Sequence, residues 1–288
     1  MEEVPKVIDI RNVIRNSGSG FFKSLPGFII TAIEKLISQD EMNATIYRHH
    51  DKSGIPFISD VLEGWNVKTE IRGTWNIPAC GRHIFVSNHP LGAIDALSFL
   101  KAIHRFFQGV VSPSNEMLSL IQNLQPVLLG INVFGKNSRE TAEKLNELFE
   151  SDNQVMIFPS GEVSRRKKGI ISDPVWHKTF VSKAVQYKRD IIPVHISGRN
   201  SNMFYFIANL REFLGIKMFV ESALLPREMM KQRNSTVTLT FGKVIPYTSL
   251  SGEKSPQEWA QYIKEIVYRL PGLIPAATNS KINELISQ

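Results

Sequence analysis

Apolar and polar residues alternate along the chain in a way that predicts buried strands separated by helices. Short apolar runs typical of strands occur at residues 84–86, 154–158 and 190–197, and a later alternating strand is expected at 236–241. Between these runs, apolar residues recur at the three-to-four spacing of a helix with one buried face. Strands that alternate with helices indicate an α/β domain in which most strands are parallel.

Signals at helix ends place several of these helices. The helix expected at 138–150 begins with a polar residue, has one apolar face and forms a crossover between parallel strands. Asp173 and Pro174 are typical of a helix start, with the aspartate as N-cap and the proline in the first turn. Ser255 and Pro256 predict the start of a final amphipathic helix in the same way.

The chain is expected to have two parts. Residues 1–70 predict an N-terminal helical cap, with apolar residues at helical spacing over 24–38 and a second short helix near 55–62. Residues 71–288 predict an α/β domain with a mixed, largely parallel sheet flanked by helices. An edge strand over 67–72 leads into this domain.

The first long helix of the cap has two interpretations. In one, it packs over the opening of the site. In the other, Phe21, Phe22, Phe28 and Ile29 contact a membrane. Exposed apolar patches are uncommon without a partner, so the amino-acid pattern supports both interpretations about equally.

The first candidate chemistry lies where the strand predicted from the apolar run at 84–86 ends. Asn88 and His89 follow this strand at its carboxyl end, which is where open α/β sheets bind their ligands. Gly92 helps to turn the chain into a helix, so His89 and Asp95 flank a strand-to-helix elbow. An imidazole can take a proton from a hydroxyl when a nearby carboxylate holds the imidazole in one tautomer and stabilises the imidazolium that forms. The sequence therefore predicts His89 as a general base and Asp95 as the residue that orients it.

Two further motifs follow in order, FPSG at 158–161 and IPV at 192–194. Together with Asn88, His89 and Asp95, they resemble the ordered motifs of the glycerolipid O-acyltransferases that acylate glycerol-3-phosphate and lysophosphatidate. The resemblance spans about residues 70 to 245. The variant with proline and glycine after the histidine is similar to a bacterial, hemolysin-like branch, which includes enzymes that acylate lyso-ornithine and lyso-glycine lipids.

Two departures from the family pattern bear on the acceptor. Five residues separate His89 from Asp95, where the family usually has four. Ser160 stands where most relatives have a glutamate that is assigned to acceptor binding, and Glu162 lies two places further on. Either Glu162 takes over from a displaced backbone, or the headgroup of the acceptor differs from glycerol phosphate. Both departures resemble the aminolipid branch.

The resemblance implies an O-acyltransferase that moves a fatty acyl group from acyl-carrier protein or acyl-CoA to the hydroxyl of a lysolipid. A lyso-aminolipid is the expected acceptor, and lysophosphatidate is the alternative. A non-catalytic module that binds lipid or acyl carrier is the alternative of another class. The acyl thioester is a co-substrate, and neither a metal nor an organic cofactor is expected. Because no serine lies in a Gly-x-Ser-x-Gly elbow, direct transfer without an acyl-enzyme is expected.

Residues near the motifs supply the expected acceptor contacts. The family's second motif ends in a basic residue that helps to hold a phosphate, and Lys136 and Arg139 lie nearest to that position, although Lys136 also fits a solvated loop lysine. Arg165 is expected to contact a phosphate or carboxylate, and the lysines after Arg166 are expected to contact lipid headgroups. The predicted binding residues are Asn88, Lys136, Arg139, Ser160, Gly161, Glu162, Arg165 and Arg166.

Two residues within the motifs carry further expectations. Gly161 permits a close approach of the backbone to a ligand, and an amide at its turn is expected to stabilise an oxyanion. His195 is expected to be a core or strand-end histidine, because no partner histidine or carboxylate lies at metal-ligand spacing.

Composition narrows the partners only slightly. The 288 residues carry a net charge of +7, which favours an anionic partner such as phospholipid, an acidic carrier or nucleic acid. Composition does not choose among these, and the resemblance implies lipid and acyl carrier without nucleic acid. The single cysteine, Cys80, excludes an intrachain disulfide and suits a reducing cytosol.

The sequence contains no run of the roughly 18 uninterrupted apolar residues that a membrane span needs. The charged amino terminus is not typical of a signal peptide, so a peripheral protein on the cytoplasmic face of the inner membrane is expected. Residues 203–219 are the most apolar segment, with Arg211 and Lys217 interspersed. An interfacial segment is the preferred interpretation, and a buried helix pair around Gly215 is the alternative.

Overall fold

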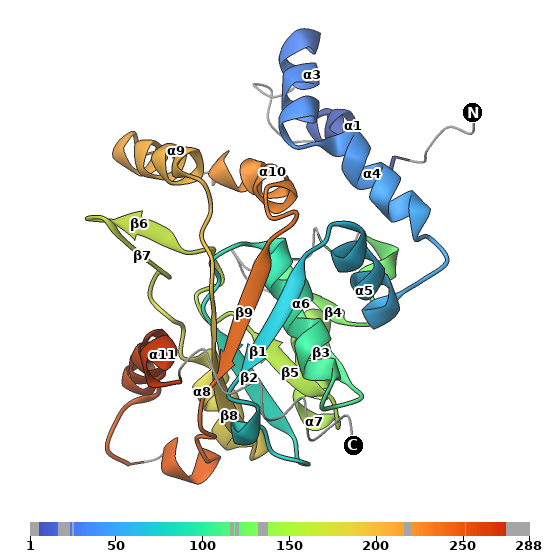
Figure 1. Ribbon diagram of the computed structural model, residues 1–288. Coiled ribbons are helices and arrows are strands. Elements are labelled where there is room, and N and C mark those ends of the chain that lie inside the picture. Colours follow the sequence, from blue (N-terminus) through green and yellow to red (C-terminus); the bar gives the residue numbers. More distant parts are fainter. Residues whose placement is uncertain are drawn as a thin grey trace.

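The protein has a central sheet with helices on both faces, as Figure 1 shows for a computed structural model. The structure describes residues 6–16, 24, 26–115, 118, 121–131, 138–215, 220–250 and 252–274.

The sheet has seven strands in the order β1-β9-β8-β2-β5-β3-β4. The strands from β8 to β4 run parallel, while β9 is antiparallel to β8 and pairs in parallel with β1 at the edge. The mixed, largely parallel sheet that the sequence predicted is confirmed, as is the edge position of β1. The strands are β1 Lys68–Arg72, β2 His83–Ser87, β3 Val110–Asn115, β4 Leu128–Ile131, β5 Gln154–Ile157, β8 Asp190–Ile196 and β9 Thr236–Phe241.

The helices and one hairpin complete the described chain. The hairpin consists of β6 Arg165–Lys167 and β7 Ile170–Ser172, which pair in antiparallel fashion. The α-helices are α1 Ile10–Asn16, α3 Gly27–Leu36, α4 Gln39–Arg48, α5 Gly54–Gly64, α6 Ala93–His104, α7 Arg139–Glu150, α8 Thr179–Tyr187, α9 Asn202–Phe213, α10 Leu225–Met230 and α11 Pro256–Leu273. The short 3-10 helices are η1 Thr74–Asn76, η3 Gln122–Leu124, η4 Val220–Leu224 and η5 Tyr247–Leu250.

Strand β2 lies in the middle of the sheet and is buried on both faces. Phe85 belongs to a core that β2 shares with α5 and α6, whereas Ile84 and Val86 belong to a second core with α8 and α11. Successive side chains of a strand point to opposite faces, so a continuous apolar run is what a strand between two helical layers requires. This burial fixes the end of β2, from which the elbow of the candidate site begins.

The described chain before β1 is helical, and the division into a cap of residues 1–70 and an α/β domain stays a prediction. Helices α1, α3 and α4 lie together at one end of the molecule in Figure 1. Helix α5 differs from them because Phe57 and Ile58 enter the main core and α5 packs against α6. Phe28 is exposed and Ile29 half-buried, while Phe21 and Phe22 lie outside the described residues.

Most predicted helix starts are confirmed, and one is wrong. Ser138 is the N-cap of α7 and accepts a hydrogen bond from the amide of Thr141, and Ser255 caps α11. The helix expected from Asp173 begins instead at Thr179 as α8. Asp173 does not cap a helix because its carboxylate accepts hydrogen bonds from other residues. These residues are described with the candidate site below.

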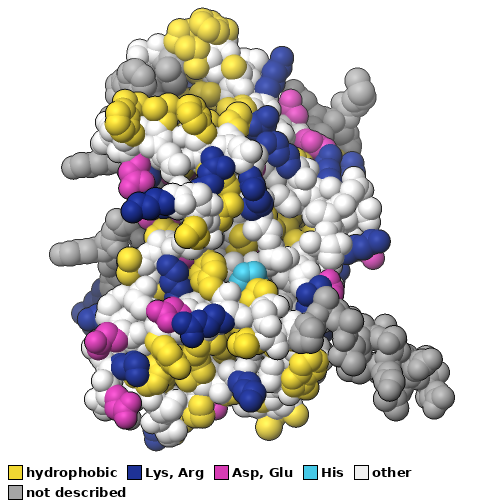
Figure 2. All heavy atoms as spheres, turned by 60° about the vertical axis from the view of Figure 1, so that its left-hand side comes forward, with side chains coloured by type: hydrophobic (Ala, Val, Ile, Leu, Met, Phe, Trp, Pro, Cys, Tyr) yellow, Lys and Arg dark blue, Asp and Glu magenta, His cyan; other side chains and the backbone are white. Residues whose placement is uncertain are grey.

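The part of the apolar segment 203–219 up to residue 213 lies in helix α9, which has two contrasting faces, and residues 216–219 lie outside the described residues. Phe204, Tyr205 and Ala208 are buried, whereas Phe206 and Phe213 are exposed to 62% and 85%. Figure 2 shows hydrophobic side chains gathered in the upper part of one face of the molecule. Among the described helices, none is long and apolar enough to cross a bilayer.

Arg189 offers a test of the fold, because it lies between α8 and β8 with no exposed surface. Its guanidinium donates to the carbonyls of Phe149 and Asn153 at 2.8 Å each, and to that of Ser151. We expect Arg189→Met to lower the free energy of unfolding by about 2–4 kcal/mol, because buried carbonyls lose their donors. Urea unfolding measures the loss. Arg105→Met, at an exposed arginine, is the control and should change stability little.

Candidate active site

The elbow between β2 and α6 brings the predicted base and its orienting residue together. The Nδ1 atom of His89 lies 3.1 Å from Oδ2 of Asp95. The extra residue between them does not separate them, because Gly92 takes a backbone conformation (φ 84°, ψ −117°) that favours glycine. This turn places Asp95 in the first turn of α6.

The Asp95 carboxylate is fully buried and held by three donors. The amides of Leu91 and Ala96 each donate to it at 2.8 Å, and His89 Nδ1 is the third. A buried carboxylate without a proton can only accept, so Nδ1 of His89 carries the proton in this bond. The lone pair of the neutral imidazole is then on Nε2, which is the arrangement of a general base.

The His89 ring is fixed from a second side by the next motif. Phe158 follows β5, and its ring stacks on the imidazole with centroids 3.9 Å apart and an interplanar angle of 19°. The His89 side chain nevertheless keeps 17% of its surface exposed. The ring is therefore positioned by packing and still open to a substrate.

Asp173 also contacts His89, and this role was missed from the sequence. Its Oδ1 atom accepts from the His89 amide at 3.1 Å and from the Ser164 hydroxyl at 2.5 Å, and its Oδ2 accepts from Trp176 Nε1 at 3.0 Å. The Ser164 amide in turn donates to the His89 carbonyl at 2.8 Å. Asp173 thus joins the elbow to the loop after β5 and does not cap a helix.

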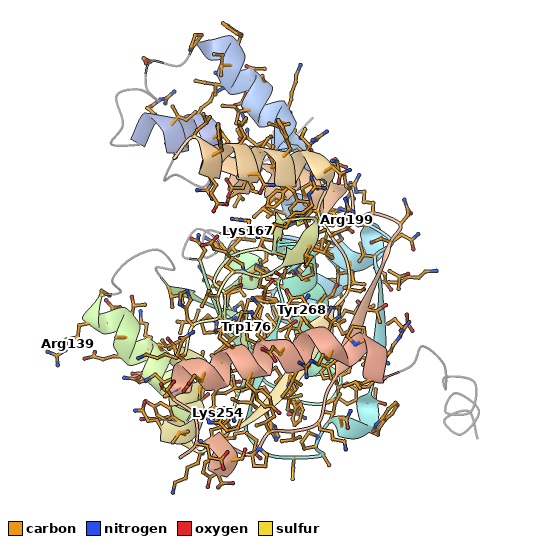
Figure 3. All side chains as sticks on the ribbon, turned by 90° about the vertical axis from the view of Figure 1, so that its left-hand side faces the viewer. Arg139, Lys167, Trp176, Arg199, Lys254 and Tyr268 are labelled. Atoms are coloured by element: carbon orange, nitrogen blue, oxygen red, sulfur yellow. The ribbon has the colours of Figure 1, made fainter. Side chains whose placement is uncertain are left out.

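Helix α11 forms hydrogen bonds with the backbone of Asp173. The Asp173 amide donates to the Tyr268 hydroxyl at 2.7 Å, and Lys264 Nζ donates to the Asp173 carbonyl at 2.6 Å. In Figure 3, α11 runs past the labelled Tyr268 and Trp176 in the middle of the molecule. Burial raises the pKa of Tyr268, so its phenol stays protonated at neutral pH.

The two carboxylates decide the charge behaviour of His89. Burial alone would lower the pKa of the imidazole, but the charge of Asp95, its hydrogen bond and the charge of Asp173 outweigh burial. The Arg165 guanidinium acts in the opposite direction. The net result is a His89 pKa above its ordinary value of 6.5, which makes the imidazole a stronger base.

The FPSG motif at residues 158–161, which corresponds to the third motif of the resembled family, forms a tight turn beside His89. Gly161 has φ +66°, and its amide closes the turn by donating to the Phe158 carbonyl at 3.0 Å. The Gly161 amide is therefore already hydrogen-bonded within the turn. The predicted stabilisation of an oxyanion by a backbone amide near Gly161 stays a prediction for the amides of adjacent residues. The Ser160 hydroxyl donates to the Glu162 carbonyl at 2.7 Å and is buried.

Two arginines of the basic run after this motif are held by side chains of the same chain. Arg165 is buried, and its Nη2 lies 3.1 Å from Glu162 and 2.9 Å from Glu221. Arg166 donates to the side chain of Asn202 at 3.0 Å. The structure thus brings Arg165 and Glu162 to the site as an ion pair, and their contacts with a substrate stay predictions.

The remaining predicted binding residues lie in different places. The Asn88 amide is buried and pairs with the backbone of Ile196, both donating and accepting, so it holds the end of β2 to β8. Arg139 is 93% exposed, pairs with Glu143 and points away from the body of the molecule in Figure 3. Lys136 lies outside the described residues. The structure therefore does not bring Arg139 to the elbow.

His195 is half-buried, and its ring lies edge-on to Tyr268 with centroids 6.0 Å apart. Burial lowers its pKa to about 4, so it is neutral at pH 7. This agrees with the expected core or strand-end role.

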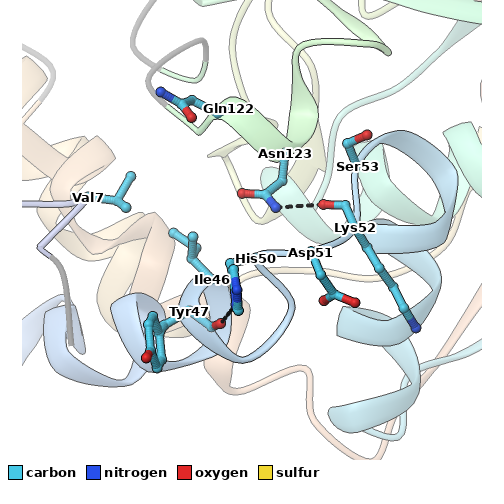
Figure 4. Close-up of a pocket in the computed structure, with 9 residues that line it drawn as sticks. All are labelled: Val7, Ile46, Tyr47, His50, Asp51, Lys52, Ser53, Gln122 and Asn123. Atoms are coloured by element: carbon cyan, nitrogen blue, oxygen red, sulfur yellow. Dashed lines mark hydrogen bonds between the residues drawn. The ribbon is translucent and has the colours of Figure 1, made fainter. Parts of the chain in front are cut away.

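A pocket occurs elsewhere, between α4, the turn after it and η3. Figure 4 shows its lining, which includes Ile46, His50 and Asn123. Asn123 donates to the Lys52 carbonyl at 2.6 Å and so closes one side. None of the predicted site residues lines this pocket, so it has no part in the chemistry of the elbow.

Comparison with known proteins gives the same assignment as the motifs. Residues 12–276 match a family model described as acyltransferase. A lyso-glycine lipid O-acyltransferase from Bacteroides thetaiotaomicron is 38% identical over 265 residues, which cover 92% of this chain and 97% of that protein. A protein of the same name from Phocaeicola vulgatus is 37% identical and covers 92% of this chain and 95% of its own length.

Among solved structures, the 1-acyl-sn-glycerophosphate acyltransferase from Thermotoga maritima is similar with a TM-score of 0.47 and 18% identity. The match covers 84% of this chain and 86% of that one. The family model and the two sequence relatives each extend over most of the chain. The chain therefore belongs to the acyltransferase family and is an acyl-transferring enzyme.

Proposed function

We propose that this enzyme moves a fatty acyl group from a thioester to the hydroxyl of a lyso-aminolipid, with a lyso-glycine lipid as the first acceptor to test. The observation that carries the proposal is the similarity to two lyso-glycine lipid O-acyltransferases over 92% of the chain. The donor is an acyl group on acyl-carrier protein or CoA, and the reaction takes place at a membrane surface without a metal or organic cofactor.

The charges near the site support this acceptor class over a phosphate. A dianionic headgroup is usually bound by several converging cations. Of the three predicted cations that the structure describes, Arg139 points outward, Arg165 is balanced by Glu162 and Glu221, and Arg166 donates to the side chain of Asn202. A headgroup with a single carboxylate, or a zwitterionic headgroup, needs fewer cations in its binding site. Lysophosphatidate is therefore the second acceptor to test.

In the proposed mechanism, Nε2 of His89 takes the proton from the acceptor hydroxyl as its oxygen attacks the thioester carbonyl carbon. Asp95 stabilises the imidazolium that forms. When the tetrahedral intermediate collapses, the carbon–sulfur bond breaks and the leaving thiolate takes the proton from the imidazolium. The products are an ester and a free thiol, and no acyl-enzyme forms.

Replacement of the base gives the most direct test. We expect His89→Ala to lower turnover by about two to four orders of magnitude, which is the usual contribution of a positioned general base. His104→Ala is the control, because His104 is exposed at the end of the same helix that carries Asp95. Release of free thiol in the presence of lysolipid measures both variants. Near-normal turnover of His89→Ala would contradict the mechanism.

The pH dependence tests the role of the two carboxylates. The base works only when neutral, so kcat/KM should rise with pH to a plateau, with a midpoint above 6.5 because the pKa of His89 is raised. Asp95→Asn and Asp173→Asn each remove a negative charge that raises this pKa. Both variants should therefore move the midpoint to lower pH, and Asp95→Asn should also lower the plateau by about a hundredfold or more. Unchanged midpoints in both variants would contradict this account of the site.

A panel of acceptors tests the substrate class. Purified protein is incubated with an acyl thioester and, separately, with lyso-glycine lipid, lyso-ornithine lipid and lysophosphatidate. We expect thiol release and diacylated product with an aminolipid at a kcat/KM at least about tenfold above that with lysophosphatidate, since Arg139 lies away from the elbow and Arg165 is already paired with two carboxylates. A preference for lysophosphatidate would overturn the acceptor assignment. Saturable binding without thiol release would indicate a binding module in place of an enzyme.

A further inference from the structure

Helix α9 carries a continuous apolar stripe on its outer face. Met203, Phe206, Leu210, Phe213 and Leu214 are all exposed, and their spacing of three or four residues places them on one side of the helix. Exposed apolar side chains that form one contiguous face indicate a surface with a partner.

This face is not the result of a loosely attached helix. The opposite side of α9 contributes Phe204 and Tyr205 to a small buried cluster that also contains Val163 and Leu224. The Arg165 guanidinium lies 5.7 Å from the centre of the Phe204 ring, and that of Arg166 lies 5.6 Å from the centre of the Tyr205 ring. The helix is therefore seated on the β6–β7 hairpin, and its outer stripe is held in a fixed position.

The hairpin extends the apolar surface and adds positive charge. Ile170 is 70% exposed and pairs with Lys167 across the hairpin. Lys167 reaches α9 through an ion pair with Glu212 at 3.0 Å, and Lys168 is exposed at the turn. We call the stripe of α9 together with Ile170 the α9 surface. In Figure 2, Lys and Arg side chains lie directly below and beside the gathered hydrophobic side chains.

We propose that the α9 surface docks onto a lipid bilayer that carries anionic headgroups. This inference rests on the proposed function, because a lysolipid acceptor is held in a membrane. The apolar stripe fits the boundary between headgroups and acyl chains, and the lysines of the hairpin fit anionic headgroups beside it. The net charge of +7 acts in the same direction.

A buried ion pair network connects this surface to the active site. Glu221 has no exposed surface and lies 2.9 Å from Arg211 of α9 and 2.9 Å from Arg165 of β6. Arg165 also pairs with Glu162 of the third motif and is close enough to influence the pKa of His89. Docking through α9 therefore places the bilayer beside the loop that carries the third motif.

The test uses the full-length protein with the two most exposed aromatic side chains of the stripe replaced, F206S together with F213S. Vesicles of phosphatidylcholine mixed with phosphatidylglycerol are sedimented with the protein. Relative to wild type, binding of the double variant should fall by at least about tenfold, because two aromatic side chains no longer enter the bilayer. Activity on lysolipid embedded in vesicles should fall with it, while activity on a short-chain lysolipid dispersed in water should stay within about twofold of wild type.

Trp75→Ser is the matched control. Trp75 is 65% exposed and belongs to η1, which follows the carboxyl end of β1. Because β1 runs antiparallel to β2, this end of β1 and the elbow after β2 lie at opposite ends of the strands. We expect this variant to bind vesicles like wild type. Circular dichroism checks that each variant is folded. We expect all variants to fold, because the replaced side chains are exposed.

Several outcomes would overturn the proposal. These are wild-type protein that does not bind the vesicles, a double variant that binds as well as wild type, and Trp75→Ser that loses as much binding as the double variant. A change from dimer to monomer in the double variant, with vesicle binding kept, would assign the surface to a second copy of the chain. If the double variant loses binding while wild type acylates no lysolipid, the docking surface stands and the proposed function fails.

Discussion

The buried carboxylate of Asp173 is the interaction on which the active-site loops depend. This carboxylate accepts hydrogen bonds from the His89 amide, the Ser164 hydroxyl and the Trp176 indole. The backbone of Asp173 forms hydrogen bonds with Tyr268 and Lys264 of α11. A charged group out of water is tolerated only when donors surround it. The elbow after β2, the loop after β5 and α11 must therefore stay in one arrangement, and that arrangement places the base.

The fold class could be predicted from the sequence because the signals for its strands and helices were local. The apolar run at 84–86 had the composition of a strand buried on both faces, and Ser138 and Ser255 marked helix starts by side-chain hydrogen bonds to nearby amides. The pair of His89 and Asp95 was also predictable, since the residues lie on one elbow. Strand order was not predictable, because it depends on contacts between distant segments.

What the sequence did not reveal was the set of long-range partners around the site. Asp173 had the local signature of an N-cap, yet its donors include His89, 84 positions away. Glu221 carries no local signal, and its partner Arg165 lies 56 positions earlier. Such pairs form only when the tertiary structure brings the segments together and excludes water. The same limit applies to Arg165, for which substrate contact was expected but which pairs with two carboxylates of its own chain.

The turn at Gly92 has a consequence for how sequence motifs of this family are defined. Helix periodicity does not set the separation between base and carboxylate, because the turn before α6 absorbs the intervening residues. The five residues between His89 and Asp95 therefore leave the two side chains 3.1 Å apart. A search pattern with a fixed gap would pass over chains such as this one. A pattern that requires a glycine before a helix with aspartate in its first turn would describe the physical constraint itself.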